Sequence, residues 1–371
     1  MKIVTVLGAR PQFIKAAPLS RALSTSAEVS EVIVHTGQHF DPAMSDVFFT
    51  QLDIPRPQYE LGISSLTHGA MTGRMVEALE RVFVEERPDC VLVYGDTNST
   101  LAGALAATKL LLPVVHVEAG LRSRNPRMPE EVNRVLTDRI AAALFCPTTE
   151  AATNLASEGF PGPAIGLKGD VVRQRIAVVG DVMYDAVLHY RSLAMERVDL
   201  SALGLEAGAY VLCTLHRQEN TDDPRRLRGI LSALQQIARE LQVVLPIHPR
   251  TRHRLAGTGL DDLLRGITVI DPLPYLEIQR LQMGAVVILT DSGGLQKEAL
   301  FHQVPCVTLR DETEWVETVT SGWNVLVGAD EQRILTAFRE RQPGDLAALG
   351  AFGDGDAATR IAQDLVAWGL T

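Results

Sequence analysis

Short runs of apolar, mostly β-branched residues alternate with longer helical stretches along almost the whole chain, and this alternation limits the possible folds more than any other feature. The runs are apolar at consecutive positions, which is typical of parallel strands that helices cover on both faces. The pattern starts at Lys2 and starts again at Tyr210. We therefore predict two α/β halves in series, each built around a parallel sheet.

The predicted strands form two sets. In the first half they are Lys2–Leu7, Val32–Thr36, Cys90–Tyr94, Val114–Glu118, Leu144–Cys146 and Ile176–Val179. In the second half they are Tyr210–Thr214, Val243–Ile247, Ile267–Ile270, Val286–Thr290, Cys306–Leu309 and Val325–Val327. The predicted helices include Pro11–Leu23, Thr67–Arg87, Thr100–Leu112 and the closing, apolar-periodic Ala357–Gly369.

Length and composition favour two domains. At roughly 150 residues per domain, a chain of 371 residues with 46% hydrophobic residues can build two cores. The segment 159–180 is rich in Gly and Pro and is interpreted as the inter-domain region. We place an N-terminal Rossmann-like domain at residues 1–175 and a C-terminal one at residues 176–355, with the helix 356–371 packing back on the first. The two domains are expected to face each other across a cleft.

The charge balance excludes several classes of partner. With 45 acidic and 35 basic residues the formal charge is −10, and no basic block favours nucleic acid or anionic lipid. No apolar run approaches the roughly 20 residues of a membrane-spanning helix, and the first residues indicate a strand rather than a signal peptide. The four cysteines are far apart with no C-x-x-C, and the three that sit inside apolar strand-like runs are expected as buried free thiols. A cytoplasmic protein is the expectation.

Nearly every polar cluster follows a predicted strand, and the carboxyl ends of parallel strands are where such sheets bind ligands. In the first half these clusters are Gly8-Ala9-Arg10-Pro11-Gln12 with Lys15, Gly95-Asp96-Thr97-Asn98-Ser99-Thr100, His116-Val117-Glu118-Ala119-Gly120-Leu121-Arg122-Ser123 and Pro129-Glu130-Glu131-Val132-Asn133-Arg134. Each also fits an ordinary strand-to-helix turn, helix cap or helix N-terminus. Arg10 and Lys15 are spaced to face one anion, without a G-x-G-x-x-G fingerprint.

Three carboxylates of the first half indicate more than capping. Asp96, Glu118 and Glu130 lie at separate strand ends or helix starts. Glu118 ends an apolar strand and is expected to be half buried, a setting that suits a catalytic acid or base. Together the three carboxylates indicate proton transfer.

The second half carries clusters that suit an anion. His216-Arg217-Gln218-Glu219-Asn220 and His248-Pro249-Arg250 follow consecutive strands, and loop histidines or a metal site are the alternatives. Asp291-Ser292-Gly293-Gly294-Leu295-Gln296-Lys297-Glu298 opens a helix whose free N–H groups suit a phosphate. Glu298, roughly one turn in, is placed to bind a ribose diol, and Arg310 is expected to line the same cleft.

These motifs, in this order, resemble those of the non-hydrolysing UDP-N-acetylglucosamine 2-epimerases, a family of the two-domain glycosyltransferase-B fold. The resemblance extends from Gly8 to about Gly328 and includes Thr36-Gly37-Gln38-His39. It implies an α/β fold of two Rossmann-like parallel-sheet domains and an isomerase that needs no cofactor and no metal. It also implies a homodimer.

The resemblance implies the reaction and the roles of the residues. Members invert C2 of a UDP-sugar: a base removes the C2 proton while UDP leaves C1, and the glycal intermediate takes UDP back with reprotonation on the opposite face. Asp96, Glu118 and Glu130 would be acid/base and sugar-orienting carboxylates, and His216 the histidine beside the diphosphate. The residues expected to bind substrate are Arg10, Lys15, Arg134, His248, Arg250, Ser292, Gly293, Gly294, Glu298, Arg310, and Tyr275 in a loop beside the uracil.

Departures from the family pattern bear on the substrate. Many members have an arginine after Thr313-Glu314, where this sequence has Trp315. Trp315, Met44-Ser45-Asp46-Val47-Phe48-Phe49 and Leu295-Gln296-Lys297-Glu298 are more similar to the branch that acts on UDP-2,3-diacetamido-2,3-dideoxy-glucuronate. The expected substrate is UDP-N-acetylglucosamine, with that acid as the alternative. Some members bind an activating second UDP-sugar through glutamines, of which only Gln38 is apparent, so activation is not expected.

Other functions share parts of this pattern. A hydrolysing epimerase would release UDP and free N-acetylmannosamine. A UDP-dependent glycosyltransferase would bind UDP with the second domain but would not require three carboxylates in the first. A regulatory protein that only binds sugar nucleotides would not need buried carboxylates near a dianionic ligand.

Overall fold

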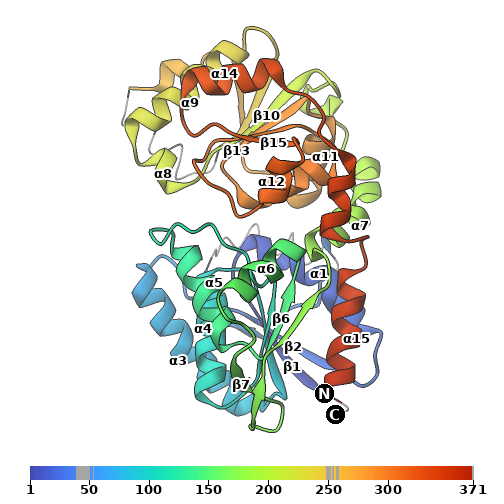
Figure 1. Cartoon of the computed structure of the whole chain (residues 1–371). Coiled ribbons are helices and arrows are strands. Elements are labelled where there is room, and N and C mark those ends of the chain that lie inside the picture. Colours follow the sequence, from blue (N-terminus) through green and yellow to red (C-terminus); the bar gives the residue numbers. More distant parts are fainter. Residues whose placement is uncertain (39–50, 53, 248–251, 253–254, 256–258, 370–371) are drawn as a thin grey trace. The chain divides into compact units, whose positions relative to one another are not determined.

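The computed structural model describes residues 1–38, 51–52, 54–247, 252, 255 and 259–369. The chain forms two compact units (Figure 1). The first comprises Met1–Leu188 and Gly350–Thr371, and the second comprises His189–Leu349. Each contains a parallel sheet with helices on its faces, as the alternating pattern predicts.

The first unit contains a seven-stranded sheet in the order β3-β2-β1-β4-β5-β6-β9, with every neighbouring pair parallel. The strands are β1 (Lys2–Leu7), β2 (Ser30–His35), β3 (Tyr59–Glu60), β4 (Cys90–Tyr94), β5 (Val114–Val117), β6 (Ala143–Cys146) and β9 (Arg175–Val178). The strand order reverses at β1, between β2 and β4. In open parallel sheets the ligand crevice lies at such a reversal, beyond the carboxyl ends of the strands.

Helices cover both faces of this sheet. They are α1 (Arg10–Ser24), α3 (His68–Glu86), α4 (Asn98–Lys109), α5 (Pro129–Ile140), α6 (Thr149–Ser157) and α15 (Ala357–Gly369). The helix α7 (Val182–Arg197) begins in this unit and ends in the second, because the division falls after Leu188. The last helix, α15, contacts α1 although the two lie at opposite ends of the sequence (Figure 1). Its start is held by Asp185 of α7, which accepts the backbone N–H groups of Ala357 at 3.2 Å and Ala358 at 2.7 Å.

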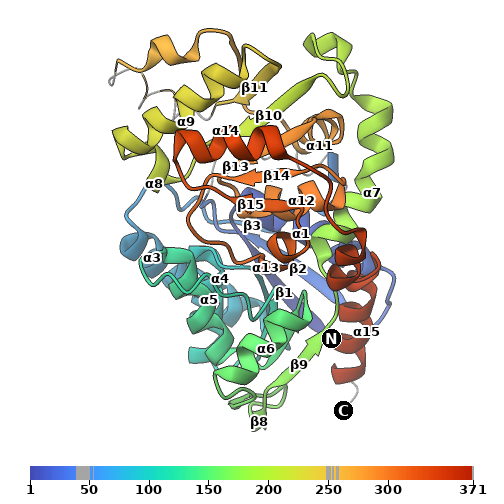
Figure 2. The same ribbon diagram turned by 45° about the horizontal axis from the view of Figure 1, so that its top comes forward.

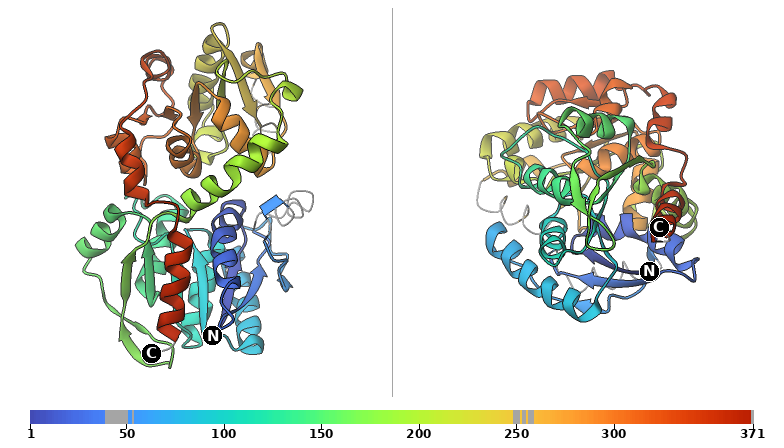
Figure 3. Two further views of the ribbon diagram at one scale, coloured as in Figure 1. Left: turned by 90° about the vertical axis from the view of Figure 1, so that its right-hand side faces the viewer. Right: turned by 60° about the horizontal axis from the view of Figure 1, so that its bottom comes forward.

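The segment 159–180, interpreted from its composition as inter-domain, has its own structure within the first unit. It contains an antiparallel hairpin, β7 (Pro163–Ile165) and β8 (Val171–Arg173), and then β9. In the left view of Figure 3 the hairpin is the green ribbon at the lower edge. Because β9 pairs with β6, the division between the units falls after Leu188 rather than at residue 176.

The second unit contains a six-stranded parallel sheet in the order β12-β11-β10-β13-β14-β15. Its strands are β10 (Tyr210–Thr214), β11 (Gln242–Pro246), β12 (Ile267–Ile270), β13 (Val287–Thr290), β14 (Cys306–Thr308) and β15 (Asn324–Leu326). Its helices are α8 (Gln218–Thr221), α9 (Pro224–Ile237), α11 (Tyr275–Gly284), α12 (Gly293–Phe301), α13 (Val316–Thr320) and α14 (Glu331–Glu340). Figure 2 shows α9 and α14 side by side, and their apolar residues complete a core with the sheet.

Two further expectations concern the cysteines and the helices. All four cysteines are buried free thiols, a state predicted for the three inside strand-like runs. Within the described part of the chain no helix is both long and apolar enough to cross a bilayer. The short strand β3 and the hairpin β7–β8 are elements that the sequence pattern did not predict.

Candidate functional site

The turn between β1 and α1 is built around a glycine and a glutamine. A side chain at Gly8 would collide with the hydroxyl groups of Thr36 and Ser99, so only glycine fits there. Gln12, 1% exposed, accepts the backbone N–H of Gly8 at 2.9 Å and donates to the carbonyl of Tyr94 at 3.0 Å. Gln12 therefore ties the carboxyl ends of β1 and β4 together and fixes the position where Arg10 begins α1.

Lys15 and Glu118 form an ion pair at the carboxyl end of this sheet. The Lys15 ammonium contacts Oε2 of Glu118, and both side chains are largely buried. Glu118 adopts a left-handed backbone conformation with φ of +69°, directly after the end of β5. A Cβ at Gly95 would lie 3.1 Å from Oε2 of Glu118 and 3.2 Å from Nζ of Lys15. The ion pair thus lies directly against Gly95, the residue before Asp96.

Asp96 forms a second ion pair with a buried arginine. Arg134, 2% exposed, contacts Oδ2 of Asp96 and donates to Oε2 of Glu131 at 2.8 Å. The Asp96 side chain keeps 28% of its surface exposed. Thr97, not Asp96, caps α4 by accepting the N–H of Thr100 at 3.3 Å. The Asp96 carboxylate therefore does not cap α4, although its position in the sequence also allowed that role.

The two neighbouring glutamates of α5 differ in their surroundings. Glu131 is 6% exposed and accepts the backbone N–H groups of Ser123 and Arg124, each at 2.9 Å. These bonds fix the loop before α5, a structural role that the sequence pattern did not separate from that of Glu130. Glu130 is only partly buried, in the first turn of the helix.

Gln38 lies on the amino end of α4. Its Oε1 accepts the backbone N–H of Ser99 at 3.0 Å and the Ser99 hydroxyl at 2.8 Å. The hydroxyl groups of Ser99 and Thr36 lie 2.8 Å apart. Of the motif Thr36-Gly37-Gln38-His39, His39 lies outside the described residues, as does Met44-Ser45-Asp46-Val47-Phe48-Phe49.

In the second unit, His216 is oriented by a buried carboxylate. Asp291, 0% exposed, lies at the end of β13, and its Oδ1 is 3.2 Å from Nδ1 of His216. The same carboxylate accepts the backbone N–H groups of His216 and Arg217 and the amide of Asn220 at 2.9–3.2 Å. Burial alone would raise the pKa of Asp291, but His216 and these donors lower it below its usual value. The His216 side chain is half exposed, at 49%.

The N-terminus of α12 already faces a carboxylate. Ser292 is the N-cap residue and Gly293 the first residue of the helix. A Cβ at Gly293 would collide with the Glu314 carboxylate, which pairs with Arg310 at 3.0 Å. A helix N-terminus of this kind favours negative charge, because its first N–H groups have no partner within the helix. At Gly294, by contrast, the nearest side-chain atom to a Cβ would be 3.6 Å away, on Glu298.

Glu298 and Tyr275, both expected to bind the nucleoside, lie inside the unit. Glu298 is 4% exposed and accepts a hydrogen bond from Gln282 at 2.7 Å. Tyr275 is 1% exposed, its hydroxyl contacts Gln279, and its ring lies edge-on to Tyr190 at 5.8 Å. Tyr275 is therefore packed inside the second unit, at the start of α11.

Trp315 lies against a buried cation. The Lys297 ammonium lies 4.1 Å from the centroid of the Trp315 ring, and the two residues are 1% and 2% exposed. Such a cation–π contact is worth up to about 2 kcal/mol where water is excluded. At the position where the resemblance leads one to expect an arginine, this chain thus has an aromatic ring that contacts a lysine of α12.

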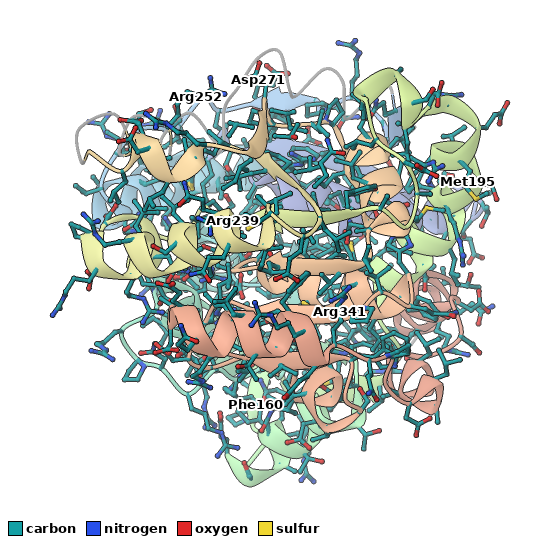
Figure 4. All side chains as sticks on the ribbon, turned by 90° about the horizontal axis from the view of Figure 1, so that it is seen from above. Phe160, Met195, Arg239, Arg252, Asp271 and Arg341 are labelled. Carbon is teal, nitrogen blue, oxygen red and sulfur yellow. The ribbon has the colours of Figure 1, made fainter. Side chains whose placement is uncertain are left out.

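Two expected binding residues, His248 and Arg250, lie outside the described residues. The described neighbour Arg252 forms an ion pair with Asp271 at 3.0 Å, and Figure 4 shows the two beside each other. This pair joins the segment after β11 to the segment after β12, on the surface.

The two units therefore carry different chemistry. The first brings together Lys15, Glu118, Asp96 and Arg134 beyond β4 and β5. The second brings together His216 with Asp291 and, at the start of α12, Gly293 with the Glu314–Arg310 ion pair. The sequence pattern did not assign the orienting role to Asp291, although its place directly after β13 is a signal that could have revealed it.

Comparison with known proteins gives a consistent result. The family model described as UDP-N-acetylglucosamine 2-epimerase matches residues 21–366. A UDP-2,3-diacetamido-2,3-dideoxy-D-glucuronate 2-epimerase from Pseudomonas aeruginosa is 51% identical over 367 residues, which cover 98% of this chain and 99% of the relative.

Solved structures agree with the family match. The crystal structure of Methanocaldococcus jannaschii UDP-GlcNAc 2-epimerase in complex with UDP-GlcNAc and UDP is 40% identical, with a TM-score of 0.90. The match covers 99% of this chain and 100% of that one. Glycosyltransferase VinC in complex with DTDP, 17% identical over 100% of both chains with a TM-score of 0.55, shares the fold alone. The expected glycosyltransferase-B fold is thereby confirmed.

Proposed function

Because this chain belongs to the UDP-N-acetylglucosamine 2-epimerase family, we propose that it inverts C2 of a UDP-amino sugar without hydrolysing the sugar nucleotide. The family membership makes it a carbohydrate epimerase. The substrate, the reaction course and the roles of the residues below are our proposal, supported by the geometry of the two units.

The proposed reaction is an elimination followed by a re-addition. A base removes the C2 proton, the C2–H electron pair forms a C1–C2 double bond, and the C1–O bond breaks with its electrons leaving on UDP. UDP then adds back to C1 of the glycal while a proton is delivered to the opposite face of C2. Atoms and electrons balance without an oxidant or reductant. Because no carbonyl group activates the C2 hydrogen, stabilising the departing diphosphate matters as much as the base.

The first unit would act on the sugar. Asp96, Glu118 and Glu130 would supply the acid/base and sugar-orienting carboxylates, in an order that the proposal leaves open. Two of them are held by cations, Glu118 by Lys15 and Asp96 by Arg134. Such pairing fixes the carboxylates in position, which supports a reaction that needs proton transfer at a defined carbon.

The second unit would hold UDP. The N-terminus of α12, with Ser292, Gly293 and Gly294, would bind the diphosphate, with His216 donating to its developing charge. Arg310, His248 and Arg250 would add positive charge, and Glu298 would bind the ribose. Arg10, a residue of the first unit, is a further cation proposed for the diphosphate. The contact between Nδ1 of His216 and Asp291 supports this role, because it directs Nε2 to the ligand. A homodimer is part of the proposal and is tested by light scattering.

UDP-2,3-diacetamido-2,3-dideoxy-glucuronate is the substrate we favour. One observation carries this choice: the relative with that activity is 51% identical over 98% of this chain, against 40% for the UDP-GlcNAc-bound structure. Trp315 adds support, since it replaces the arginine expected of many UDP-N-acetylglucosamine epimerases. UDP-N-acetylglucosamine, the substrate that the motifs alone placed first, is the second candidate.

Specificity constants for the two UDP-sugars test the choice. We expect kcat/KM for the diacetamido acid to exceed that for UDP-N-acetylglucosamine by at least about 100-fold, the scale that a recognised polar group brings. A preference in the other direction would restore UDP-N-acetylglucosamine as the substrate. Accumulation of UDP with free sugar would instead indicate a hydrolysing epimerase.

A further inference from the structure

His116 is a fully buried histidine whose two ring nitrogens are both hydrogen-bonded. It lies in β5 between apolar neighbours, and its side chain is 0% exposed. Nδ1 is 2.8 Å from Oδ1 of Asp138, and Nε2 is 2.7 Å from the backbone carbonyl oxygen of Gly95. A buried imidazole requires such partners, because an unpaired polar atom inside a protein costs about 1–3 kcal/mol.

The hydrogen-bond partner of Nε2 shows whether this nitrogen carries a hydrogen. A carbonyl oxygen has no hydrogen to donate, so Nε2 must carry a hydrogen that it donates to Gly95. For Nδ1 the answer depends on whether its partner, Asp138, is ionised. Oδ2 of Asp138 accepts from the Arg122 guanidinium at 2.7 Å and from the backbone N–H of Gly120 at 3.2 Å.

These donors keep Asp138 ionised. Burial alone would raise the pKa of Asp138, but its charged neighbours lower it below its usual value, and one of them, the Arg122 guanidinium, is a cation whatever the state of His116. An ionised carboxylate only accepts, so Nδ1 must also carry a hydrogen. Both ring nitrogens of His116 then donate, and the ring is an imidazolium cation.

The charged groups around this ring alternate in sign. His116 faces Asp138, Asp138 also faces Arg122, and Arg122 forms two bonds to Glu158 at 2.6 and 2.9 Å. Glu158 is the one member of this series with substantial exposure, 29% of its side chain. The charge on His116 is therefore balanced inside the unit and does not depend on a ligand.

The other end of the series is His116, which contacts Gly95. Gly95 lies next to the proposed catalytic carboxylates Glu118 and Asp96. The Gly95 N–H donates to the Val117 carbonyl at 2.9 Å, and the Gly95 carbonyl accepts from His116. Residues of β5 therefore hold both backbone polar groups of Gly95. Gly95 has a φ of +61°, and the Lys15–Glu118 ion pair lies against its α-carbon. Asp96 follows directly. A shift of the Gly95 peptide would therefore move Asp96 relative to Glu118.

We propose that His116 is a doubly protonated imidazolium which, held by Asp138, positions the Gly95–Asp96 turn against Glu118 for proton transfer. His116 and Asp138 are positioning residues rather than catalytic residues. The inference rests on the proposed function, because it assigns a use to the spacing of two carboxylates whose roles are proposed there. It adds a requirement that the motifs do not state: the reaction needs a buried ion pair beneath the turn.

Nitrogen NMR of the histidine rings tests the protonation directly. In ¹⁵N-histidine-labelled wild-type protein at pH 7.5, we expect both ring nitrogens of His116 to be protonated, with the signal assigned by its loss in His116→Gln. His302 is the internal reference: it is buried, neither of its ring nitrogens has a hydrogen-bond partner among the described residues, and burial lowers its pKa to about 3. Its ring should be neutral. One unprotonated nitrogen on His116 would overturn the proposal.

Kinetics test the positioning role. In Asp138→Asn we expect one His116 nitrogen to lose its proton. We also expect kcat to fall on the order of 10- to 100-fold, because the carboxylates are displaced. KM should stay within about threefold, because the residues proposed to bind UDP are unchanged. Asp138→Glu keeps the carboxylate and should recover part of kcat and both ring protons. Glu158→Gln, the control at the exposed end of the series, should leave kcat within about twofold.

The outcomes separate this inference from the proposed function. A folded Asp138→Asn variant with wild-type kcat would contradict the positioning role. If Asp138→Asn does not fold, the wild-type spectrum and the Asp138→Glu variant decide instead. Wild-type protein that converts neither UDP-sugar would contradict the proposed function, whereas the ring spectra of that same sample would still decide the protonation of His116.

Discussion

Oδ1 of Asp291 lies 3.2 Å from Nδ1 of His216, and both oxygens of this carboxylate accept the backbone N–H of the same histidine at 3.1 Å. The carboxylate, at the end of β13, thus holds both the backbone and the ring of a residue that follows β10. With Nδ1 engaged, Nε2 is the ring nitrogen that can meet a ligand. Asp291 therefore fixes the orientation of the His216 ring.

Replacing Asp291 by Asn should reduce activity and stability together. The new amide group would face N–H donors that the carboxylate now accepts, and His216 would lose its charged partner. We expect kcat to fall on the order of 100-fold and the free energy of unfolding to fall by about 2–3 kcal/mol. Urea unfolding and steady-state kinetics measure the two effects. An active variant of wild-type stability would show that Asp291 does not orient His216.

Asp96→Asn and His216→Ala should each lose most activity while the protein stays folded. Both side chains are partly exposed, at 28% and 49%, so their replacement leaves the cores intact. We expect at least about a 100-fold loss of kcat in each, with circular dichroism and melting temperature close to wild type. Glu77→Gln, at an exposed ion pair of α3, is the surface control. Near-wild-type turnover in either variant would refute the role assigned to that residue.

The neighbouring residues Glu130 and Glu131 provide a matched pair of variants. Glu131→Gln should lower the free energy of unfolding by about 2–4 kcal/mol, because the buried Arg134 loses its charged partner and one of the two loop N–H groups then faces an amide NH2 instead of an acceptor. Glu130→Gln should lose activity with a change in stability within about 0.5 kcal/mol. Thermal melts beside kcat separate the two. The opposite assignment of effects would mean that Glu131 is the catalytic glutamate.

Stability should depend on pH in a defined way. Because the folded-state pKa values of Asp138 and Asp291 are lowered, their stabilisation is present above the unfolded pKa of about 3.9 and is lost as the pH falls through the lower folded values. Burial raises the pKa of Asp185 to about 6, so this residue has the opposite effect: its share of stability is present at low pH and is lost as the pH rises through about 6.

Unfolding experiments between pH 7 and pH 3 test these signs. Between pH 7 and pH 5 two effects oppose each other. Protonation of Asp185 favours the folded state, whereas His302, whose pKa burial lowers to about 3, favours the unfolded state as the pH falls below the unfolded pKa of about 6.5. Stability should then fall steeply below about pH 4, and less steeply in Asp291→Asn. In Asp185→Asn the loss from pH 7 to pH 5 should be larger than in wild type, and an unchanged pH profile in that range would contradict the assignment of Asp185.

Replacing Trp315 by the arginine expected of many family members tests the contribution of the Trp315–Lys297 contact to stability. Trp315→Arg would put a second cation beside the buried Lys297 and remove the ring that holds it. We expect a loss of about 3 kcal/mol in the free energy of unfolding, and partial recovery when Lys297→Met is added. Trp315→Phe, which keeps an aromatic ring, should cost less. A Trp315→Arg variant as stable as wild type would show that the contact with Lys297 has no structural value.

Much of the fold could be predicted because parallel strands that are buried on both faces leave a strong pattern. The predicted strands Cys90–Tyr94 and Tyr210–Thr214 agree with β4 and β10 to the residue. The misses are short elements at sheet edges or outside the main sheets. β3 has two residues and the strands of the β7–β8 hairpin have three each, too few for a periodic signal.

The candidate site could be predicted as a set of residues but not as a set of contacts. Lys15 and Glu118 are both expected site residues, yet 103 positions separate them, and only the order of the sheet reveals that they meet. Asp291 is interpreted from the sequence as part of a phosphate loop; its place directly after β13 puts it at the same edge of the sheet as His216, but only the structure shows the contact between them. Tyr275 is expected beside the uracil from the family resemblance, and the structure adds that its ring is buried against Tyr190.

The central claim is non-hydrolysing epimerisation at C2, and a proton NMR time course in deuterated water, with no added metal, tests it most directly. The enzyme is incubated with UDP-2,3-diacetamido-2,3-dideoxy-glucuronate and, in parallel, with UDP-N-acetylglucosamine. The account predicts that the manno-configured UDP-sugar appears with deuterium at C2 and that free sugar does not accumulate. Inversion with the C2 proton retained, net release of UDP and free sugar, or no reaction with either nucleotide would contradict it.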